Sequence, residues 1–442
     1  MDVLRLQGPP GREERTESHL HPQLWQRGIV LCCVGITAIV YVLIAQALGP
    51  QAFGRYLFVQ WLATVALPML GVGVSTLTSN QLATIQSRES PRRMAGIFYF
   101  LWYRQHQSIL LYCLLYLLLA FPLARLFHIF SVSLLLLSGL ATLPLLLSSV
   151  VGTTLRSLRR ADLLTMLHLF NELLTLLFVT VALQVEGRPL EAFLLAFALA
   201  HTLTLILAVI CVIHLLPLEK ALQPGIFLKE RLQQSLTHAW LPFTLDTIIW
   251  HRSELFLLAC WRSSAELGFY ALSALISMAI MNVSPALYFY GIYPLFQRTL
   301  PRYRTAYDAF IKISCCILFL AILCSSLAVV FSPTLVTQWL GSAYLPLIRP
   351  LRILLVAAVF GSMASVSLTH MTSGEEQHVR RWPEFVVACV KIILAIPLIA
   401  FWGIVGAAVV SACAQIASAL LSMMQCRQLL KRRESSCGGE GI

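Results

Sequence analysis

The chain alternates between long apolar stretches and shorter segments that carry most of its polar residues. We count twelve apolar stretches of about 20 residues each. An α-helix rises 1.5 Å per residue, so each stretch is long enough to cross the ~30 Å hydrocarbon core of a bilayer. The stretches lack the two-residue alternation of barrel strands, so helices are predicted. The predicted spans are residues 28–48, 57–77, 108–127, 131–151, 163–183, 193–216, 241–260, 269–289, 311–331, 351–370, 383–401 and 403–424.

The Lys and Arg residues divide unequally between the segments that connect these spans. If odd-numbered spans run outward, one set of segments carries 23 of the 32 Lys and Arg residues, and the other set carries six. Cytoplasmic segments of membrane proteins are enriched in Lys and Arg. The pattern therefore predicts an all-α, polytopic membrane protein with both termini in the cytoplasm. The net charge of +12 follows from this orientation, and we expect no nucleic-acid partner.

The overall composition agrees with a membrane protein and narrows its function. Hydrophobic residues make up 58% of the chain and charged residues 12%, whereas soluble domains average about 25% charged residues. The segments predicted to face outward are short, which weighs against an integral-membrane glycan polymerase or ligase. The sequence contains no phosphate-binding loop, no nucleophile–base constellation and no metal-ligand spacing. We therefore expect a protein that is not an enzyme and needs no cofactor or metal.

The longest polar segment in the middle of the chain lies between spans six and seven. Within this segment, apolar and charged residues alternate at helical spacing after Pro224, which predicts an amphipathic helix on the inner membrane surface. Because this polar segment has six predicted spans on either side, it predicts two six-helix bundles. The predicted divisions are a cytoplasmic tail 1–27, a first bundle 28–216, a cytoplasmic linker 217–240, a second bundle 241–426 and a cytoplasmic tail 427–442.

A short internal repeat supports this division. Residues 52–56 open span two and residues 266–270 open span eight, and both segments contain a Gly-x-Tyr motif at an outer helix start. Gly permits a tight turn, and Tyr favours the membrane interface. Equivalent motifs in the two halves are typical of a transporter that arose by duplication.

The segment after the first predicted span, residues 48–56, reads Leu-Gly-Pro-Gln-Ala-Phe-Gly-Arg-Tyr. It resembles the L-G-P-x-x-F-G-x-Y turn after helix one in the oligosaccharide-lipid flippases of the multidrug/oligosaccharidyl-lipid/polysaccharide exporter superfamily. Residues 341–344 resemble its G-x-x-Y element after helix nine, and residues 403–408 resemble the G-x-x-G-A-A that opens helix twelve. Residues 246–270 are similar to its helix seven, and Pro294 falls where the family often has a proline. The resemblance extends over most of the chain.

The resemblance implies a flippase of the bacterial inner membrane, with two bundles that rock around a central cavity. Its cargo would be a polyprenyl-pyrophosphate-linked oligosaccharide for surface polysaccharides such as the O-antigen of lipopolysaccharide. The protein would translocate this cargo by alternating access. The implied partners are the lipid-linked oligosaccharide, membrane lipids and a membrane polysaccharide polymerase. The alternative within the same superfamily is a cation-coupled multidrug exporter.

Ionisable residues inside the predicted spans are the candidates for the transport site. A charged side chain at the bilayer centre costs roughly 2.5–3.5 kcal/mol, so such residues are expected to face water or protein. Arg252 lies in span seven and Lys391 in span eleven. Arg binds phosphates through paired donors and Lys supplies a point charge. We therefore predict that Arg252 and Lys391 contact the anionic headgroup.

Three carboxylates, Glu172, Asp246 and Glu254, are predicted either to couple transport to protons or sodium ions or to form ion pairs. At 100° per residue, Arg252 and Glu254 cannot pair along a regular helix. Arg252 then reaches an acid on another helix, for which Glu172 is a candidate, or the span is distorted. Lys391 has no acid within one turn, so it must pair with another helix, reach the interface or enter an aqueous cavity.

Overall fold

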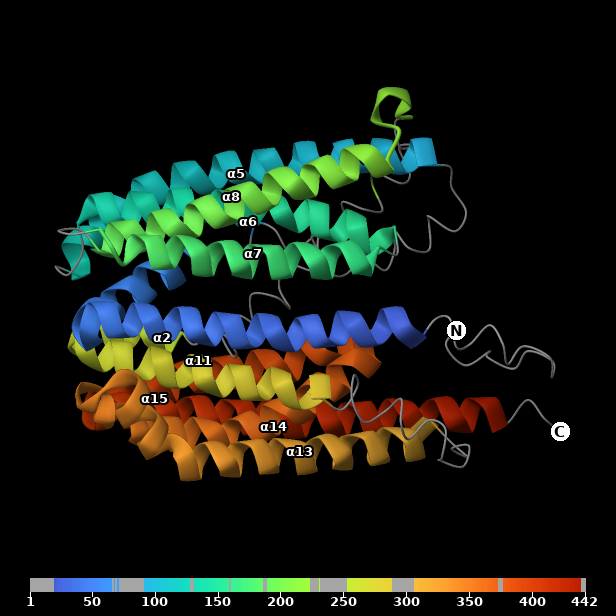
Figure 1. The fold of residues 1–442 in the computed structure, drawn as a ribbon. Coiled ribbons are helices and arrows are strands. Elements are labelled where there is room, and N and C mark those ends of the chain that lie inside the picture. The colour runs from blue at the N-terminus through green and yellow to red at the C-terminus, as the bar shows by residue number, and fades with distance from the viewer. Residues whose placement is uncertain are drawn as a thin grey trace.

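The computed structural model describes residues 20–65, 91–127, 131–158, 160–185, 189–222, 253–287, 306–372 and 377–438, with isolated residues 67, 70 and 230. All regular structure in this part of the chain is helical (Figure 1), so the predicted all-α class is confirmed. The elements are α2 (Leu20–Thr64), α5 (Pro91–Phe127), α6 (Val132–Ser157), α7 (Ala161–Ala182), α8 (Pro189–Leu215), η2 (Leu218–Lys220), α10 (Glu254–Trp261), α11 (Ser264–Leu287), α13 (Ala306–Leu335), η4 (Val336–Leu340), η5 (Ser342–Leu347), α14 (Ile348–Thr372) and α15 (Gln377–Gly438).

A described helix accounts for at least part of each predicted span. Within the described ranges, nine helices are long and apolar enough to cross a membrane. Helix α2 contains span one and the start of span two and turns at Gly49, where φ is 70°, whereas α15 contains spans eleven and twelve and turns at Gly403, where φ is 57°. Both values lie in the left-handed region that favours glycine. Only the last part of span seven is described, as α10, and the predicted amphipathic helix of the linker lies outside the described residues.

Helix α5 begins much earlier than the predicted span three, at residue 91 rather than 108. The added residues include Arg92, Arg93 and Arg104, which made this part look like a loop. Its apolar residues recur at helical spacing, however, and Met94, Phe98 and Leu101 are buried in one cluster with residues of α6 and α8. Packing of this face explains why the helix extends beyond the apolar stretch.

The helices form two groups with α2 between them (Figure 1). Helices α5, α6, α7 and α8 pack on one another, and α11, α13, α14 and α15 form the second group. Helix α2 packs against α7 on one side and against α11 on the other. The start of α2 and the end of α15 lie at the same end of the molecule, which we call the terminal end (Figure 1). The turn within α2 lies at the opposite end (Figure 1), which we call the turn end. Gly49 occupies this turn, and Gly341 and Gly403 occupy the turns between η4 and η5 and within α15.

The buried apolar residues form one shared cluster and two separate ones. The shared cluster includes Phe53 of α2, Phe193 of α8, Tyr270 of α11 and Tyr344 of η5, so it joins both groups at the turn end. Near the terminal end, one cluster contains only residues of the first group and its adjoining segments. Another contains only residues of α11, α14 and α15. In the described part of the chain, the hydrophobic core therefore connects the two groups at the turn end.

Large apolar side chains on the outer helix faces are exposed, as expected for a surface covered by lipid. Leu110 and Leu118 of α5 and Phe319 and Val330 of α13 are examples. Exposed tryptophans gather in the segments near the turn end, where an aromatic belt would mark the membrane interface. These tryptophans are Trp261, Trp339 and Trp402.

Candidate transport site

The second group contains a buried ion pair between Lys391 and Glu254. Glu254 is the first residue of α10, and Lys391 lies near the middle of the first half of α15. Lys391 Nζ is 2.9 Å from Glu254 Oε1, and both side chains are fully buried. Glu254 Oε2 has no hydrogen-bond donor among the described residues. Lys391 thus pairs with an acid on another helix, and this pair compensates two charges in a region that excludes water.

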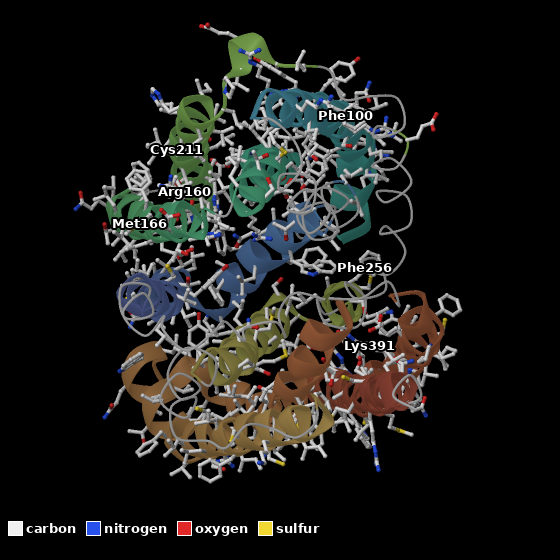
Figure 2. All side chains as sticks on the ribbon, turned by 90° about the vertical axis from the view of Figure 1, so that its right-hand side faces the viewer. Phe100, Arg160, Met166, Cys211, Phe256 and Lys391 are labelled. Atoms are coloured by element: carbon white, nitrogen blue, oxygen red, sulfur yellow. The ribbon has the colours of Figure 1, made fainter. Side chains whose placement is uncertain are left out.

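The opposite side of α10 carries an aromatic residue. Phe256 lies two residues after Glu254, which places it about 200° around the helix. Figure 2 labels Phe256 on the side of α10 toward the first group, and Lys391 on the side of α15. Helix α10 therefore presents its carboxylate to the second group and an aromatic ring toward the first group. Phe256 is 37% exposed.

The first group contains a different polar centre around Glu172, near the middle of α7. Thr37 of α2 donates a hydrogen bond of 2.8 Å to Glu172 Oε2. Asn171, the preceding residue, makes a second polar contact with the Glu172 side chain. Thr204 Oγ1 of α8 lies 3.3 Å from the side-chain oxygen of Asn171 and 2.9 Å from the Ala200 carbonyl oxygen, and it can donate to either. The centre therefore ties together α2, α7 and α8, and Glu172 is only partly buried.

The contacts of Thr37 allow Glu172 to exist in two protonation states. Thr37 Oγ1 lies 2.8 Å from Glu172 Oε2 and also 2.8 Å from the carbonyl oxygen of Cys33. A hydroxyl has one hydrogen and can donate to only one of these oxygens at a time. When it donates to Glu172, it can stabilise a charged carboxylate. When it donates to Cys33, the short contact with Glu172 is satisfied by a protonated carboxyl that donates to Thr37.

Two of the predicted site residues, Arg252 and Asp246, lie outside the described residues. The structure does not bring Glu172 and Lys391 together, because they belong to different groups of helices. Sequence reasoning did not identify Thr37 and Thr204. A lone Thr in an apolar span is common, and only the packing of α2 and α8 on α7 brings these two to the Glu172 centre.

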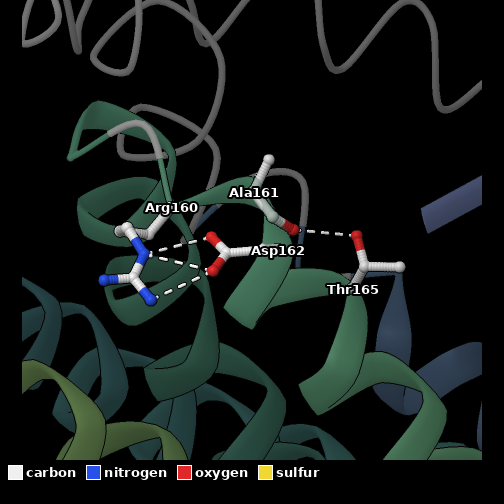
Figure 3. Close-up of polar contacts among 4 residues, drawn as sticks. All are labelled: Arg160, Ala161, Asp162 and Thr165. Carbon is white, nitrogen blue, oxygen red and sulfur yellow. Dashed lines mark hydrogen bonds and ion pairs between the residues drawn. The ribbon is translucent and has the colours of Figure 1, made fainter. Parts of the chain in front are cut away.

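An exposed ion pair lies at the terminal end of α7, away from these centres. Arg160 donates to both carboxylate oxygens of Asp162, at distances between 3.0 and 3.2 Å (Figure 3). Thr165 donates to the Ala161 carbonyl oxygen in the same turn. Exposed pairs of this kind contribute little to stability, because solvent screens both charges. Asp162 occupies the first turn of α7, where an acid is favourable, so we assign this pair to the helix start.

The fold is shared with solved structures of membrane transporters. The chain matches a structure described as lipid II flippase MurJ in an inward closed conformation, with a TM-score of 0.70 and 11% sequence identity, over 91% of this chain and 87% of that one. It matches an inward-facing multidrug resistance MATE family transporter of the MOP superfamily, with a TM-score of 0.67 and 11% identity, over 94% and 99% of the two chains.

A third solved structure also matches the chain. An outward-facing MATE family transporter of the MOP superfamily matches with a TM-score of 0.55 and 12% identity, over 94% of this chain and 95% of that one. This TM-score is lower than that of the inward-facing structure. No protein-family model and no curated protein sequence matches the chain. The chain is thus a multi-pass membrane protein with the fold of these transporters.

Proposed function

We propose that the protein is a flippase that translocates a polyprenyl-pyrophosphate-linked oligosaccharide across the bacterial inner membrane by alternating access. The oligosaccharide would serve the synthesis of a surface polysaccharide such as O-antigen. The proposal combines the flippase motifs of the sequence with a fold shared with a lipid II flippase over 91% of the chain. The excess of Lys and Arg in one set of connecting segments would place the terminal end in the cytoplasm.

The observation that carries the proposal is the buried Lys391–Glu254 pair, which joins α10 and α15 within the second group. A cation buried inside an apolar span is costly and is kept where it serves a function or a specific pairing. For Lys391 to contact cargo directly, a phosphate group would have to replace the Glu254 carboxylate as its partner. An anionic pyrophosphate is suited to this exchange, since it offers several acceptor oxygens to an ammonium group.

Arg252 is proposed as a second headgroup contact on sequence grounds. Arg would bind the pyrophosphate through paired hydrogen bonds, which Lys cannot provide.

Glu172 is proposed to couple transport to protons. The carboxyl has partners for both its charged and its protonated form, because Thr37 can donate to it or accept from it. Proton binding would change the contacts between α2 and α7, which adjoin the boundary between the two groups. Asp246 and Glu254 are the other carboxylates of this proposal, and Glu254 would act through its pair with Lys391.

Deletion of the gene tests the proposed cargo. We expect lipid-linked repeat units to accumulate on the inner leaflet and surface glycan to disappear, as measured in lipid extracts and surface-glycan gels. Wild-type protein and the surface variant Arg160→Gln should restore export, whereas Arg252→Ala should not. Normal surface glycan in the deletion strain would contradict the proposal.

The second candidate function is multidrug export, because the fold also matches a MATE family transporter with a TM-score of 0.67. Drug susceptibility of the same deletion strain distinguishes the two. A change in susceptibility to cationic drugs, together with unchanged surface glycan, would favour the exporter.

A further inference from the structure

The two Gly-x-Tyr motifs of the internal repeat meet at the turn end. Gly54 of α2 lies directly against the first turns of α11, where Gly268 is located. A Cβ atom added to Gly54 would overlap the Ser264 carbonyl oxygen and lie 2.8 Å from Gly268 N. A Cβ atom added to Gly268 would lie 2.5 Å from the Pro50 carbonyl oxygen and 3.1 Å from Gly54 N. The two helices therefore touch backbone to backbone, and neither side has room for a methyl group.

The contact joins equivalent positions of the two halves. Gly54 precedes Tyr56 by two residues, and Gly268 precedes Tyr270 by two. Both tyrosines are fully buried in the cluster shared by the two groups. Self-complementary contact between equivalent residues is what a two-fold axis produces. The crossing thus lies where a pseudo-two-fold axis relating the halves would pass.

Other bonds join α2 to the second half around this crossing. Tyr344 of η5 donates a hydrogen bond of 2.7 Å to the Ala45 carbonyl oxygen. The Gln46 side-chain amide donates to the Trp339 carbonyl oxygen. The Tyr344 ring also packs edge-on against Phe53, with 6.5 Å between ring centroids. These contacts join α2 to the second half at the turn end, where the two groups share one hydrophobic cluster.

We propose that the Gly54–Gly268 crossing is the closed gate of the turn end and that it separates in a second state of the protein. This inference rests on the alternating access of the proposed function, because a protein with one state needs no gate. The glycines permit closure: a side chain at either position keeps the backbones apart and shifts the population toward the state that is open at the turn end. If the contact were purely structural, the same substitutions would lower the amount of folded protein. They would not change how readily a reagent reaches the turn end of the folded protein.

A buried reporter cysteine tests the gate. In a variant lacking the native cysteines, Ala45→Cys places a thiol at a fully buried position beneath Tyr344. A charged maleimide is added to detergent-solubilised protein, so the result does not depend on which end faces the cytoplasm. The rate of labelling is compared in wild-type, Gly54→Ala and Gly268→Ala backgrounds. Gly35→Ala is the matched control, because it lies on the same helix and its added Cβ would meet nothing within 4 Å.

We expect Gly54→Ala and Gly268→Ala to accelerate labelling about tenfold, as a modest shift between two states would, and Gly35→Ala to leave it unchanged. Unchanged labelling in well-folded Gly54→Ala and Gly268→Ala proteins would overturn the proposal.

A second measurement leaves both glycines in place, in case these variants do not fold. Cross-linking Gln46→Cys to Trp339→Cys before the maleimide is added should hold the turn end shut. We expect the labelling of Ala45→Cys to fall to background. Labelling that continues at its original rate would also overturn the proposal. Neither readout requires cargo, so failure of the gate and failure of the proposed cargo are distinguishable.

Discussion

Removing one charge of the Lys391–Glu254 pair should destabilise the protein far more than removing both. The two charged atoms are 2.9 Å apart and both side chains are fully buried. At an effective dielectric constant of 20, this separation corresponds to about 6 kcal/mol of Coulomb attraction, which offsets much of the desolvation cost of each charge. Glu254 Oε2 has no other donor among the described residues, so the carboxylate depends strongly on Lys391.

Each single variant leaves one charge of the pair buried, and this sets the expected loss in free energy of unfolding. Lys391→Met leaves a buried carboxylate and Glu254→Gln leaves a buried ammonium, and each should cost about 3–5 kcal/mol of unfolding free energy. The double variant Glu254→Gln/Lys391→Met removes both charges at similar volume and should remain within about 1 kcal/mol of wild type. Unfolding of the purified protein in mixed micelles, followed by tryptophan fluorescence, measures these differences.

The double variant also separates a structural role from a role in transport. If Lys391 contacts the headgroup, the double variant folds normally but fails to export glycan. Full export by the double variant at wild-type protein level would refute Lys391 as a headgroup contact. Destabilisations that simply add in the double variant would refute the pair as an energetic unit.

Three further changes test other parts of the structure. Glu172→Gln keeps an acceptor for the Thr37 hydroxyl but removes the titratable proton. Transport in proteoliposomes should then no longer respond to an imposed proton gradient. Gly139→Ala places a methyl group 2.5 Å from the Tyr116 ring and should cost about 1–3 kcal/mol in thermal unfolding; Gly152→Ala, with only an ordinary contact at 3.7 Å, is its control. Tyr344→Phe removes a buried hydrogen bond and should cost about 1–3 kcal/mol, whereas an exposed tyrosine changed in the same way should have no effect.

Much of the fold was predictable from the sequence because the membrane imposes a simple rule. A span must be apolar for about 20 residues and must satisfy its own backbone, so helices and their approximate number follow from hydrophobicity. Helix ends were less predictable. The start of α5 contains three arginines, yet it remains helical because its buried face packs on α6 and α8.

The partners of the site residues were not predictable in the same way. The helical wheel restricts contacts within one helix but says nothing about distant ones. Glu254 and Lys391 are 137 positions apart in the chain, and only the packing of α10 on α15 brings them together. The Gly-x-Tyr repeat was visible in the sequence as an internal duplication. The contact between the two copies is visible only in the three-dimensional structure.

The shared hydrophobic cluster at the turn end has a consequence for local stability. Amide groups of α2 near Ala45 lie within a core built from both halves, so their exchange with deuterium should require the largest opening of the molecule. Among the described residues, the amides of α5 near Phe98 lie within the cluster of the first group and should exchange sooner. A protection gradient along the membrane normal is therefore built into the fold, and a denaturant should loosen the terminal end first.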